Sequence, residues 1–279
     1  MKLSTFTVMI PDLSPEDAVQ ELKDAGYDGV EWRVTKVPED RKDEEPSFWG
    51  NNLCTLAPTE AQAHRARALA ESAGLAISNI GAYVSIDDRE AVENVVQFAR
   101  IAGSPHVRVS PGGLEGQPYT ERFQEVKDTL HELEPLAIAE GVKLLIEIHH
   151  GTVCPSASSA YRLVRDLSPE AFGVIYDPGN MVQEGFEDYR IGVDLLGPYL
   201  AYVHVKNCGY RHPEKGTWEG YWAPLDDGIV DFVELLRVLK RAGYDGWLSM
   251  EDFSQSRSST EALRFNIDYL KDVLKKASD

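Results

Sequence analysis

The chain has 279 residues, 43% hydrophobic and 27% charged, which is enough to bury a substantial core in a globular protein. Its 28 basic and 46 acidic side chains give a net charge of −18, which argues against a nucleic-acid partner held through phosphates. No apolar run approaches the roughly 20 residues of a membrane span, and three cysteines without a CxxC pair indicate a reducing compartment, so we expect a cytoplasmic protein.

The first predicted elements contain a turn that the chain uses twice. The sequence AGYDG occurs at 25–29 and again at 242–246, each time between a helical pattern and an apolar strand. Gly26 and Gly243 fit the left-handed position that ends many helices, where a Cβ atom would clash. Looser versions of the same helix ending occur between the two copies. These observations predict a unit of helix and strand that repeats along the chain.

Eight strands are predicted in chain order, and a helical pattern follows each one: 3–9, 28–32, 75–80, 106–110, 142–148, 172–177, 200–206 and 246–251. Strands that alternate with helices pair in parallel, because a parallel connection requires a crossover. Eight such units in about 250 residues match the α/β class (β/α)8 TIM barrel. A doubly wound open sheet would have a glycine-rich loop after its first strand, and TFTVMIPDLSPED contains no glycine. We therefore expect one TIM-barrel domain over 1–279.

Two segments, 33–57 and 207–228, are too long for simple connections. We predict that they are insertions over the barrel mouth, after the second and the seventh strand. The later one contains Trp218 and Trp222 beside several tyrosines. These aromatic side chains could be ordinary core, but in a polar segment they favour a lid or a wall that stacks on a sugar.

The active site of a TIM barrel lies at the carboxyl ends of its strands. The polar residues that close the predicted strands are Glu31, Arg108, Glu147, Asp177, His204, Lys206 and Glu251. Four of them come from four consecutive strands, namely Glu147, Asp177, His204 and Glu251. Three carboxylates and one imidazole at one mouth would repel one another without a cation, so we predict a single divalent metal ion. Mn²⁺ is our first choice, and Zn²⁺, Co²⁺ and Mg²⁺ suit the same ligands.

Each of these residues also has a purely structural interpretation. A lone His204 would more often be a core histidine than a ligand, and Asp177 before Pro178 could cap a turn. Glu31 could pair with Arg33 or Arg108, support another residue or contact substrate. The four predicted ligands gain their weight from occurring together, in order, on consecutive strands.

Four segments resemble the xylose-isomerase-like TIM barrels: IEIHH at 146–150, YDPGN at 176–180, YVHVKN at 202–207 and GYDGWLSMED at 243–252. This superfamily contains sugar and sugar-phosphate isomerases and epimerases, inosose dehydratases and endonuclease IV. The resemblance covers essentially the whole chain. It implies that one divalent ion is held by a Glu, Asp, His and Glu set from strands five to eight, and it places these roles on Glu147, Asp177, His204 and Glu251.

The resemblance further implies an isomerase or epimerase that transfers a proton next to a carbonyl through an enediolate, with Glu147 and Glu251 as the catalytic carboxylates. The same intermediate could lose a hydroxyl, so a dehydratase of the inosose type is the alternative. The residues expected to bind substrate are His149, Asn180, Lys206, Arg108, Glu31, Trp218 and Trp222.

Departures from the family pattern narrow these expectations. Ketose epimerases of the family usually have a histidine where this chain has Asn180, and many members have an aspartate where it has Asn207, which argues against an ordinary ketose epimerase. Basic residues near the mouth are few, namely Arg108 and Lys206, with Arg211 and Lys215 in the insertion. We therefore favour an uncharged polyol, ketose or inosose as substrate, with an α-keto acid as the alternative.

Other function classes fit less well. An endonuclease IV-like enzyme would need three zinc ions, more than seven histidines and a basic face. A binding barrel without catalysis would be favoured by an incomplete ligand set, and this set is complete. Neither nucleic acid nor membrane is expected as a partner. Barrels of this family often pair, so a homodimer is one assembly to test.

Overall fold

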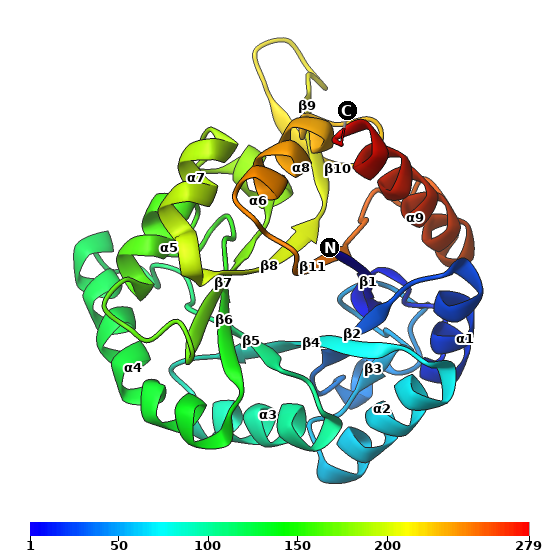
Figure 1. Ribbon diagram of the computed structural model, residues 1–279, viewed down its shortest axis with the longest axis horizontal. Coiled ribbons are helices and arrows are strands. Elements are labelled where there is room, and N and C mark those ends of the chain that lie inside the picture. The colour runs from blue at the N-terminus through cyan, green and yellow to red at the C-terminus, as the bar shows by residue number, and fades with distance from the viewer. Residues whose placement is uncertain (279) are drawn as a thin grey trace.

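The computed structural model describes residues 1–278, in which eight parallel strands form a closed ring inside a ring of helices (Figure 1). The barrel strands are β1 (Lys2–Phe6), β2 (Gly29–Val34), β4 (Ala76–Ser85), β5 (His106–Ser110), β6 (Lys143–Glu147), β7 (Phe172–Tyr176), β8 (Leu200–Val205) and β11 (Trp247–Met250). Their hydrogen-bonded order is β1-β11-β8-β7-β6-β5-β4-β2, and pairing of β1 with β2 closes the ring. The prediction of a (β/α)8 TIM barrel is confirmed.

A helix follows each barrel strand, as the repeat predicts. The helices are α1 (Pro15–Ala25), α2 (Glu60–Ala73), α3 (Arg89–Ala102), α4 (Tyr119–Glu140), α5 (Ala157–Val164), α6 (Pro178–Gln183), α7 (Tyr189–Leu196), α8 (Phe232–Arg241) and α9 (Ser259–Lys276). Short 3-10 helices occupy Thr7–Met9, Glu39–Arg41 and Gly197–Tyr199. Among the described residues, no helix is both long enough and apolar enough to cross a membrane.

The eight predicted strands are all present, and the predicted bounds 106–110 match β5 at both ends. The largest differences concern the first and third strands. β1 ends at Phe6 because the hydroxyl of Thr7 accepts a hydrogen bond from the backbone N–H of Arg33, which frees the main chain to turn. β4 continues to Ser85, five residues past its predicted end, because it pairs with β5 as well as β2.

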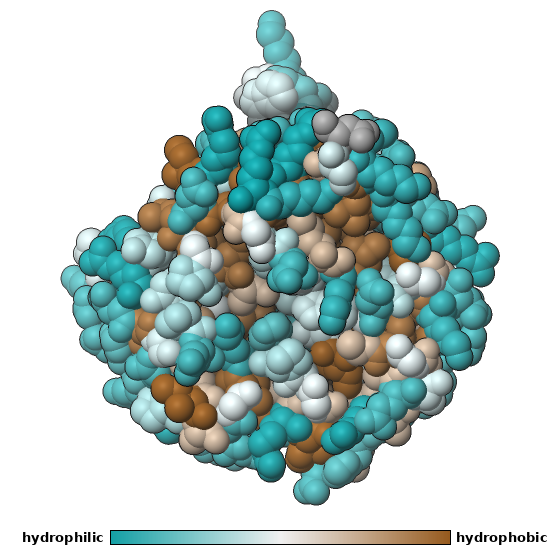
Figure 2. Space-filling view, in the orientation of Figure 1, coloured by the Kyte–Doolittle hydropathy of each residue, from teal (hydrophilic) through white to brown (hydrophobic). Residues whose placement is uncertain are grey.

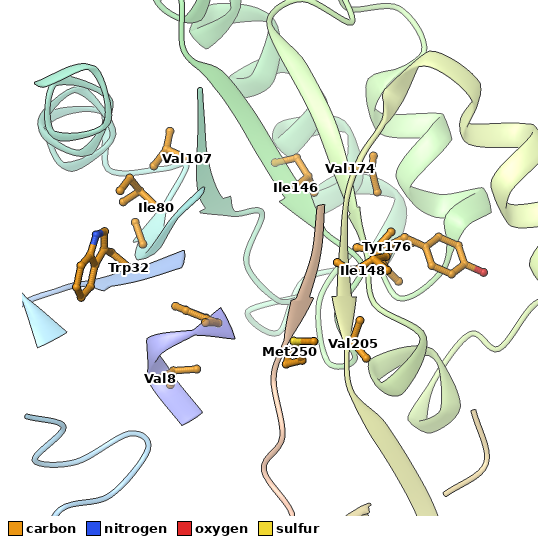
Figure 3. Close-up of a cluster of buried hydrophobic side chains, with 14 of the residues drawn as sticks. Val8, Trp32, Ile80, Val107, Ile146, Ile148, Val174, Tyr176, Val205 and Met250 are labelled. Atoms are coloured by element: carbon orange, nitrogen blue, oxygen red, sulfur yellow. The ribbon is translucent and has the colours of Figure 1, made fainter. Parts of the chain in front are cut away.

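The main hydrophobic core lies between the strands and the helices. Figure 3 shows side chains such as Trp32, Ile80, Ile146 and Val174 in this layer. Neighbouring residues of a strand point to opposite faces, so Leu145 and Ile175, which neighbour Ile146 and Val174, fill the barrel interior together with Tyr202. This alternation decides which polar side chains can reach the inside of the barrel.

Both segments predicted as insertions contain short strands. The first leads to β3 (Thr55–Leu56), which pairs in parallel with the end of β2. In the second, β9 (Asn207–Arg211) and β10 (Glu219–Ala223) form an antiparallel hairpin that projects from the barrel at the top of Figure 1. Hydrophilic side chains cover the tip of this hairpin and much of the face seen in Figure 2.

Candidate metal centre

The four predicted metal ligands lie together at the carboxyl ends of four strands. Glu147 is the last residue of β6, Asp177 follows β7, His204 lies in β8 and Glu251 follows β11. All four are buried, and each offers a ligand atom within 4.8 Å of those of the others. Three carboxylates and one imidazole therefore share one small volume at the barrel mouth.

Local sequence explains why these side chains converge. Glu147 is two residues beyond Leu145, and His204 is two residues beyond Tyr202, so strand alternation points both toward the barrel interior. Asp177 caps helix α6, since its Oδ1 accepts the backbone N–H of Asn180 at 2.8 Å. This cap directs the other carboxylate oxygen, Oδ2, toward the ligand cluster. The structural role of Asp177 as a cap is thus compatible with metal binding.

Positively charged side chains already lie against the carboxylates of this cluster, as expected of a site that can bind a metal cation. The ammonium of Lys206 lies 2.7 Å from Asp177 Oδ2 and also contacts Glu251 Oε2. Arg108 Nε lies 2.5 Å from Glu147 Oε2 on the other side. Buried carboxylates this close together require cations, and three carboxylates with one imidazole are ligands that divalent ions bind. The residues present therefore fit a divalent metal ion.

His204 contacts a carboxylate at each of its two ring nitrogens. Its Nδ1 lies 2.9 Å from Glu147 Oε1, whereas its Nε2 lies 3.3 Å from each carboxylate oxygen of Glu31. Glu31 is fully buried and accepts hydrogen bonds from Ser249 Oγ at 2.7 Å and Asn79 Nδ2 at 2.9 Å. A histidine that donates Nε2–H to such a carboxylate presents Nδ1 to a metal.

The electrostatics of the site shift the pKa values of the two candidate catalytic carboxylates in opposite directions. Burial raises the pKa of Glu251 to about 6, because the opposing charges of Lys206 and His204 offset this burial only in part. Burial also disfavours the charged form of Glu147, but Arg108, His204 and Lys206 together bring its pKa well below the ordinary value. Two carboxyl groups with separated pKa values can take different proton-transfer roles.

The same positive and negative charges act on the histidine and its support. Burial disfavours a charged His204, yet the charges of Glu31, Glu251 and Glu147 hold its pKa well above the ordinary value. Burial likewise opposes ionisation of Glu31, but the charge and hydrogen bond of His204 lower the pKa of Glu31. Metal binding at Nδ1 would therefore displace a proton from His204.

A pocket of about 260 Å³ opens beside the cluster. Its walls are Trp49, Tyr83, Arg108, Glu147, His149, His150, Lys206, Trp222, Glu251 and Phe253. A larger pocket of about 540 Å³ lies near the start of α9, but it includes none of the four ligand residues. The smaller pocket is therefore the place where a substrate would meet the cluster, and its size suits a small molecule.

The residues expected to bind substrate occupy three kinds of position. Those that line the pocket are Arg108, His149, Lys206 and Trp222. Glu31 and Asn180 are instead fully buried beside the ligands, where Asn180 Nδ2 donates to Asp177 Oδ2 at 2.9 Å. Trp218 is 69% exposed in the hairpin loop, where its ring packs on His212 at 4.4 Å between centroids, and it is not part of the pocket wall.

Sequence reasoning missed several members of the pocket wall. Tyr83 lies beyond the predicted end of its strand at residue 80, and Trp49 lies in the first insertion. Phe253 follows Glu251 by two residues, a spacing that could have identified it. His150 stacks on His149 with ring centroids 4.4 Å apart, and it also lines the pocket.

Relatives of known activity include inosose dehydratases. The enzyme of Geobacillus thermodenitrificans is 26% identical over 141 residues, a match that spans about half of each chain, 47% of both. The enzyme of Lacticaseibacillus casei is 21% identical over 259 residues, covering 85% of this chain and 81% of that protein.

Solved structures share the fold at low identity. The IOLI protein with a bound zinc atom has a TM-score of 0.77 and 18% identity, with 99% of each chain covered. The 3-keto-D-glucoside 4-epimerase YcjR of E. coli has a TM-score of 0.72 and 16% identity, covering 98% of this chain and 99% of that one.

The profile of one protein family, described as xylose isomerase-like TIM barrel, matches residues 19–273. This range includes seven of the eight barrel strands and all four candidate ligands. The chain belongs to the xylose isomerase-like TIM barrel family.

Proposed function

We propose that this protein is a metal-dependent isomerase or epimerase that moves a proton next to the carbonyl group of a small carbohydrate. The observation that carries this proposal is the buried set of Glu147, Asp177, His204 and Glu251, whose ligand atoms lie within 4.8 Å of one another beside a pocket of substrate size. Similarity to inosose dehydratases and to a 3-keto-D-glucoside 4-epimerase supports the choice of substrate class.

In this proposal the four residues hold one divalent ion, with Mn²⁺ as the first choice and Zn²⁺, Co²⁺ or Mg²⁺ as alternatives. Such an ion would polarise the carbonyl and stabilise the negative charge that develops beside it. Glu31 and Asn180 hold the ligands rather than the substrate. Trp222 and Phe253 flank the ammonium of Lys206 at 5.0 and 5.4 Å from their ring centroids, and they limit access of water to it.

The two glutamates supply the proton transfers. Glu147, whose pKa is lowered, is the group that is ionised and able to remove a proton. Glu251, whose pKa is raised to about 6, is the group that can hold a proton and return it. Return to the opposite face of the same carbon inverts that centre, and return to the neighbouring carbon exchanges an aldose with a ketose.

A dehydratase is the second candidate, because the curated relatives cited above are inosose dehydratases. In that reaction Glu147 would remove the proton in the same way. Glu251 would then donate its proton to the departing hydroxyl group, so that water leaves. The same pair of carboxyl groups serves both reactions, and the products distinguish them.

The test is a screen of ketoses, inososes and hydroxypyruvate with Mn²⁺ present in deuterated water. Product mass shows whether one water is lost, stereochemistry distinguishes epimer from starting material, and deuterium incorporation reports proton removal beside the carbonyl. Metal analysis should find about one divalent ion per chain. Full activity of the metal-free protein, or substrates that exchange no deuterium, would reject the proposal.

A further inference from the structure

The buried cations near the site have carboxylate partners, with one exception. Arg108 lies against Glu147, and Lys206 lies against Asp177. Arg33 differs from both, because the structure of residues 1–278 shows no ion pair between its guanidinium group and any carboxylate. The guanidinium group of Arg33 is therefore a positive charge at the barrel mouth that no carboxylate of the described residues pairs with.

Burial of Arg33 makes its unpaired charge unfavourable for folding. It lies on β2 two residues beyond Glu31, on the same face of the strand and nearer to the mouth, and only 5% of it is exposed. One nitrogen, Nη1, donates to the hydroxyl of Thr55, and Nε has no hydrogen-bond partner. An uncompensated buried charge destabilises a fold unless an anion offsets it.

The guanidinium group of Arg33 packs against one aromatic ring of the pocket wall, that of Tyr83. The Cζ of Arg33 lies 5.1 Å from the ring centroid of Tyr83, and the Cζ of Arg108 lies 5.0 Å from the same centroid. Tyr83 and Arg108 both line the 260 Å³ pocket that contains Glu147 and Glu251. Two positive charges thus converge on one wall of the pocket, and only that of Arg108 is paired.

We propose that the substrate carries a carboxylate group that lies against this Tyr83 wall, between the charges of Arg33 and Arg108. The inference rests on the proposed function, since it concerns the substrate of the same pocket. One uncompensated positive charge matches a carboxylate, which carries one negative charge, better than a phosphate ester, which carries about two at neutral pH. The substrate class is then a polyhydroxylated acid with a carbonyl group.

This inference revises the preference drawn from the sequence. That preference for an uncharged polyol, ketose or inosose counted the basic residues Arg108, Lys206, Arg211 and Lys215. It omitted Arg33, which the sequence offered only as one possible partner of Glu31. Arg211 in fact pairs with Glu219 on the exposed hairpin, 3.1 Å away, so it adds no free charge to the pocket.

The experiment compares two ligands that differ in one group. D-Gluconate and D-glucitol share the same polyol chain, and one end is a carboxylate in the first and an alcohol in the second. Calorimetric titration of the Mn²⁺-loaded protein gives the dissociation constant of glucitol divided by that of gluconate. In Arg33→Met this ratio should fall by about tenfold, because the variant loses the attraction of one buried positive charge for the carboxylate. Any carboxylate bond to the metal contributes equally in both proteins, so it cancels in the comparison.

Two variants control for other effects. Arg33→Lys keeps the charge and should retain part of the preference for gluconate. Arg100→Met removes an exposed arginine of α3 that pairs with Glu140, and it should leave the ratio unchanged. Thermal unfolding should show that Arg33→Met folds as stably as the wild type or more so, since it removes an unpaired buried charge.

Several results would overturn the inference. These are gluconate that binds the wild type no more tightly than glucitol, a ratio that Arg33→Met leaves unchanged, and D-glucitol 6-phosphate that binds more tightly than gluconate. Mn²⁺ binding and deuterium exchange in the same preparations keep this outcome separate from the proposed function. A protein that binds Mn²⁺ and exchanges deuterium without any preference for gluconate loses only the carboxylate assignment.

Discussion

The two copies of the AGYDG turn lead to carboxylates with different positions in the barrel. Both copies end a helix in the same way, since φ is 83° at Gly26 and 76° at Gly243. In the first copy the carboxylate is Glu31, which is fully buried beside the candidate ligand His204. In the second it is Glu251, which lines the 260 Å³ pocket.

The two carboxylates meet the same histidine from opposite sides of its ring. Glu31 follows the last glycine of its turn, Gly29, by two residues, whereas Glu251 follows Gly246 by five. Strand register offsets this difference in spacing, because Ser4 of β1 pairs with Gly29 on one side and with Ser249 on the other. Glu31 meets the Nε2 side of His204, and Glu251 comes within 3.8 Å of its Nδ1 side. The same local motif thus leads to one carboxylate that supports His204 and to another that lines the pocket.

The largest expected effect is a loss of turnover on substitution of Glu251, which distinguishes it from Glu31. Glu251→Gln should lower turnover by about a thousandfold or more while the fold is kept, because it removes a proton-transfer group at the pocket wall. Product formation with a substrate from the screen measures the loss, and circular dichroism checks the fold. Unchanged turnover would remove Glu251 from the catalytic role.

Substitution of Glu31 should act through the metal instead. Glu31→Leu removes the acceptor of His204 Nε2 and should weaken Mn²⁺ binding by about 10- to 100-fold. Glu31→Gln retains an acceptor oxygen and should lose less. Calorimetric titration with Mn²⁺ measures both variants. Equal affinity in Glu31→Leu and the wild type would show that the contact with His204 does not support the centre.

The pH dependence of stability should differ in sign between the two carboxylates in the metal-free protein. Glu251 has a pKa near 6 in the folded state against 4.5 ordinarily, so between these pH values the folded protein holds a proton that the unfolded chain has released. Its contribution to the free energy of unfolding therefore falls by about 2 kcal/mol as pH rises through this window.

Glu31 has a lowered pKa, so the stability it contributes is lost as pH falls below its ordinary range. Urea unfolding across this pH range, with Glu251→Gln as the comparison, measures the first effect. A variant whose pH profile follows that of the wild type would contradict the assignment.

The smallest expected effect concerns the tyrosines of the two turns. The hydroxyl of Tyr27 donates to the carbonyl of Leu263 at 2.8 Å and so joins the two ends of the chain, whereas that of Tyr244 donates locally to Trp247 at the same distance. Tyr27→Phe should reduce the free energy of unfolding by about 1.5 kcal/mol, and Tyr244→Phe by about half as much, since only Tyr27 is buried. Denaturant unfolding tests the order, and equal losses would show that the long-range bond adds nothing.

The sequence predicted much of the fold and the central part of the candidate site. The helix endings, the strand count and the residues that close the strands depend on local patterns, so Glu147, Asp177, His204 and Glu251 could be identified before any coordinates. Strand lengths were harder, because pairing with a neighbouring strand extends β4 to Ser85 and carries Tyr83 to the pocket. The metal, the substrate and the roles of the individual site residues stay predictions.

By itself, the sequence determined a repeated unit of strand and helix, and which strands end in a carboxylate or imidazole, because turn chemistry and strand alternation act over a few residues. Only the tertiary structure decided how those groups pair. Glu31 meets His204 across 173 positions of the chain, and Arg33 has no carboxylate partner among the described residues. Ring closure brings such distant residues together, and charge balance within the barrel depends on those distances rather than on neighbours in the sequence.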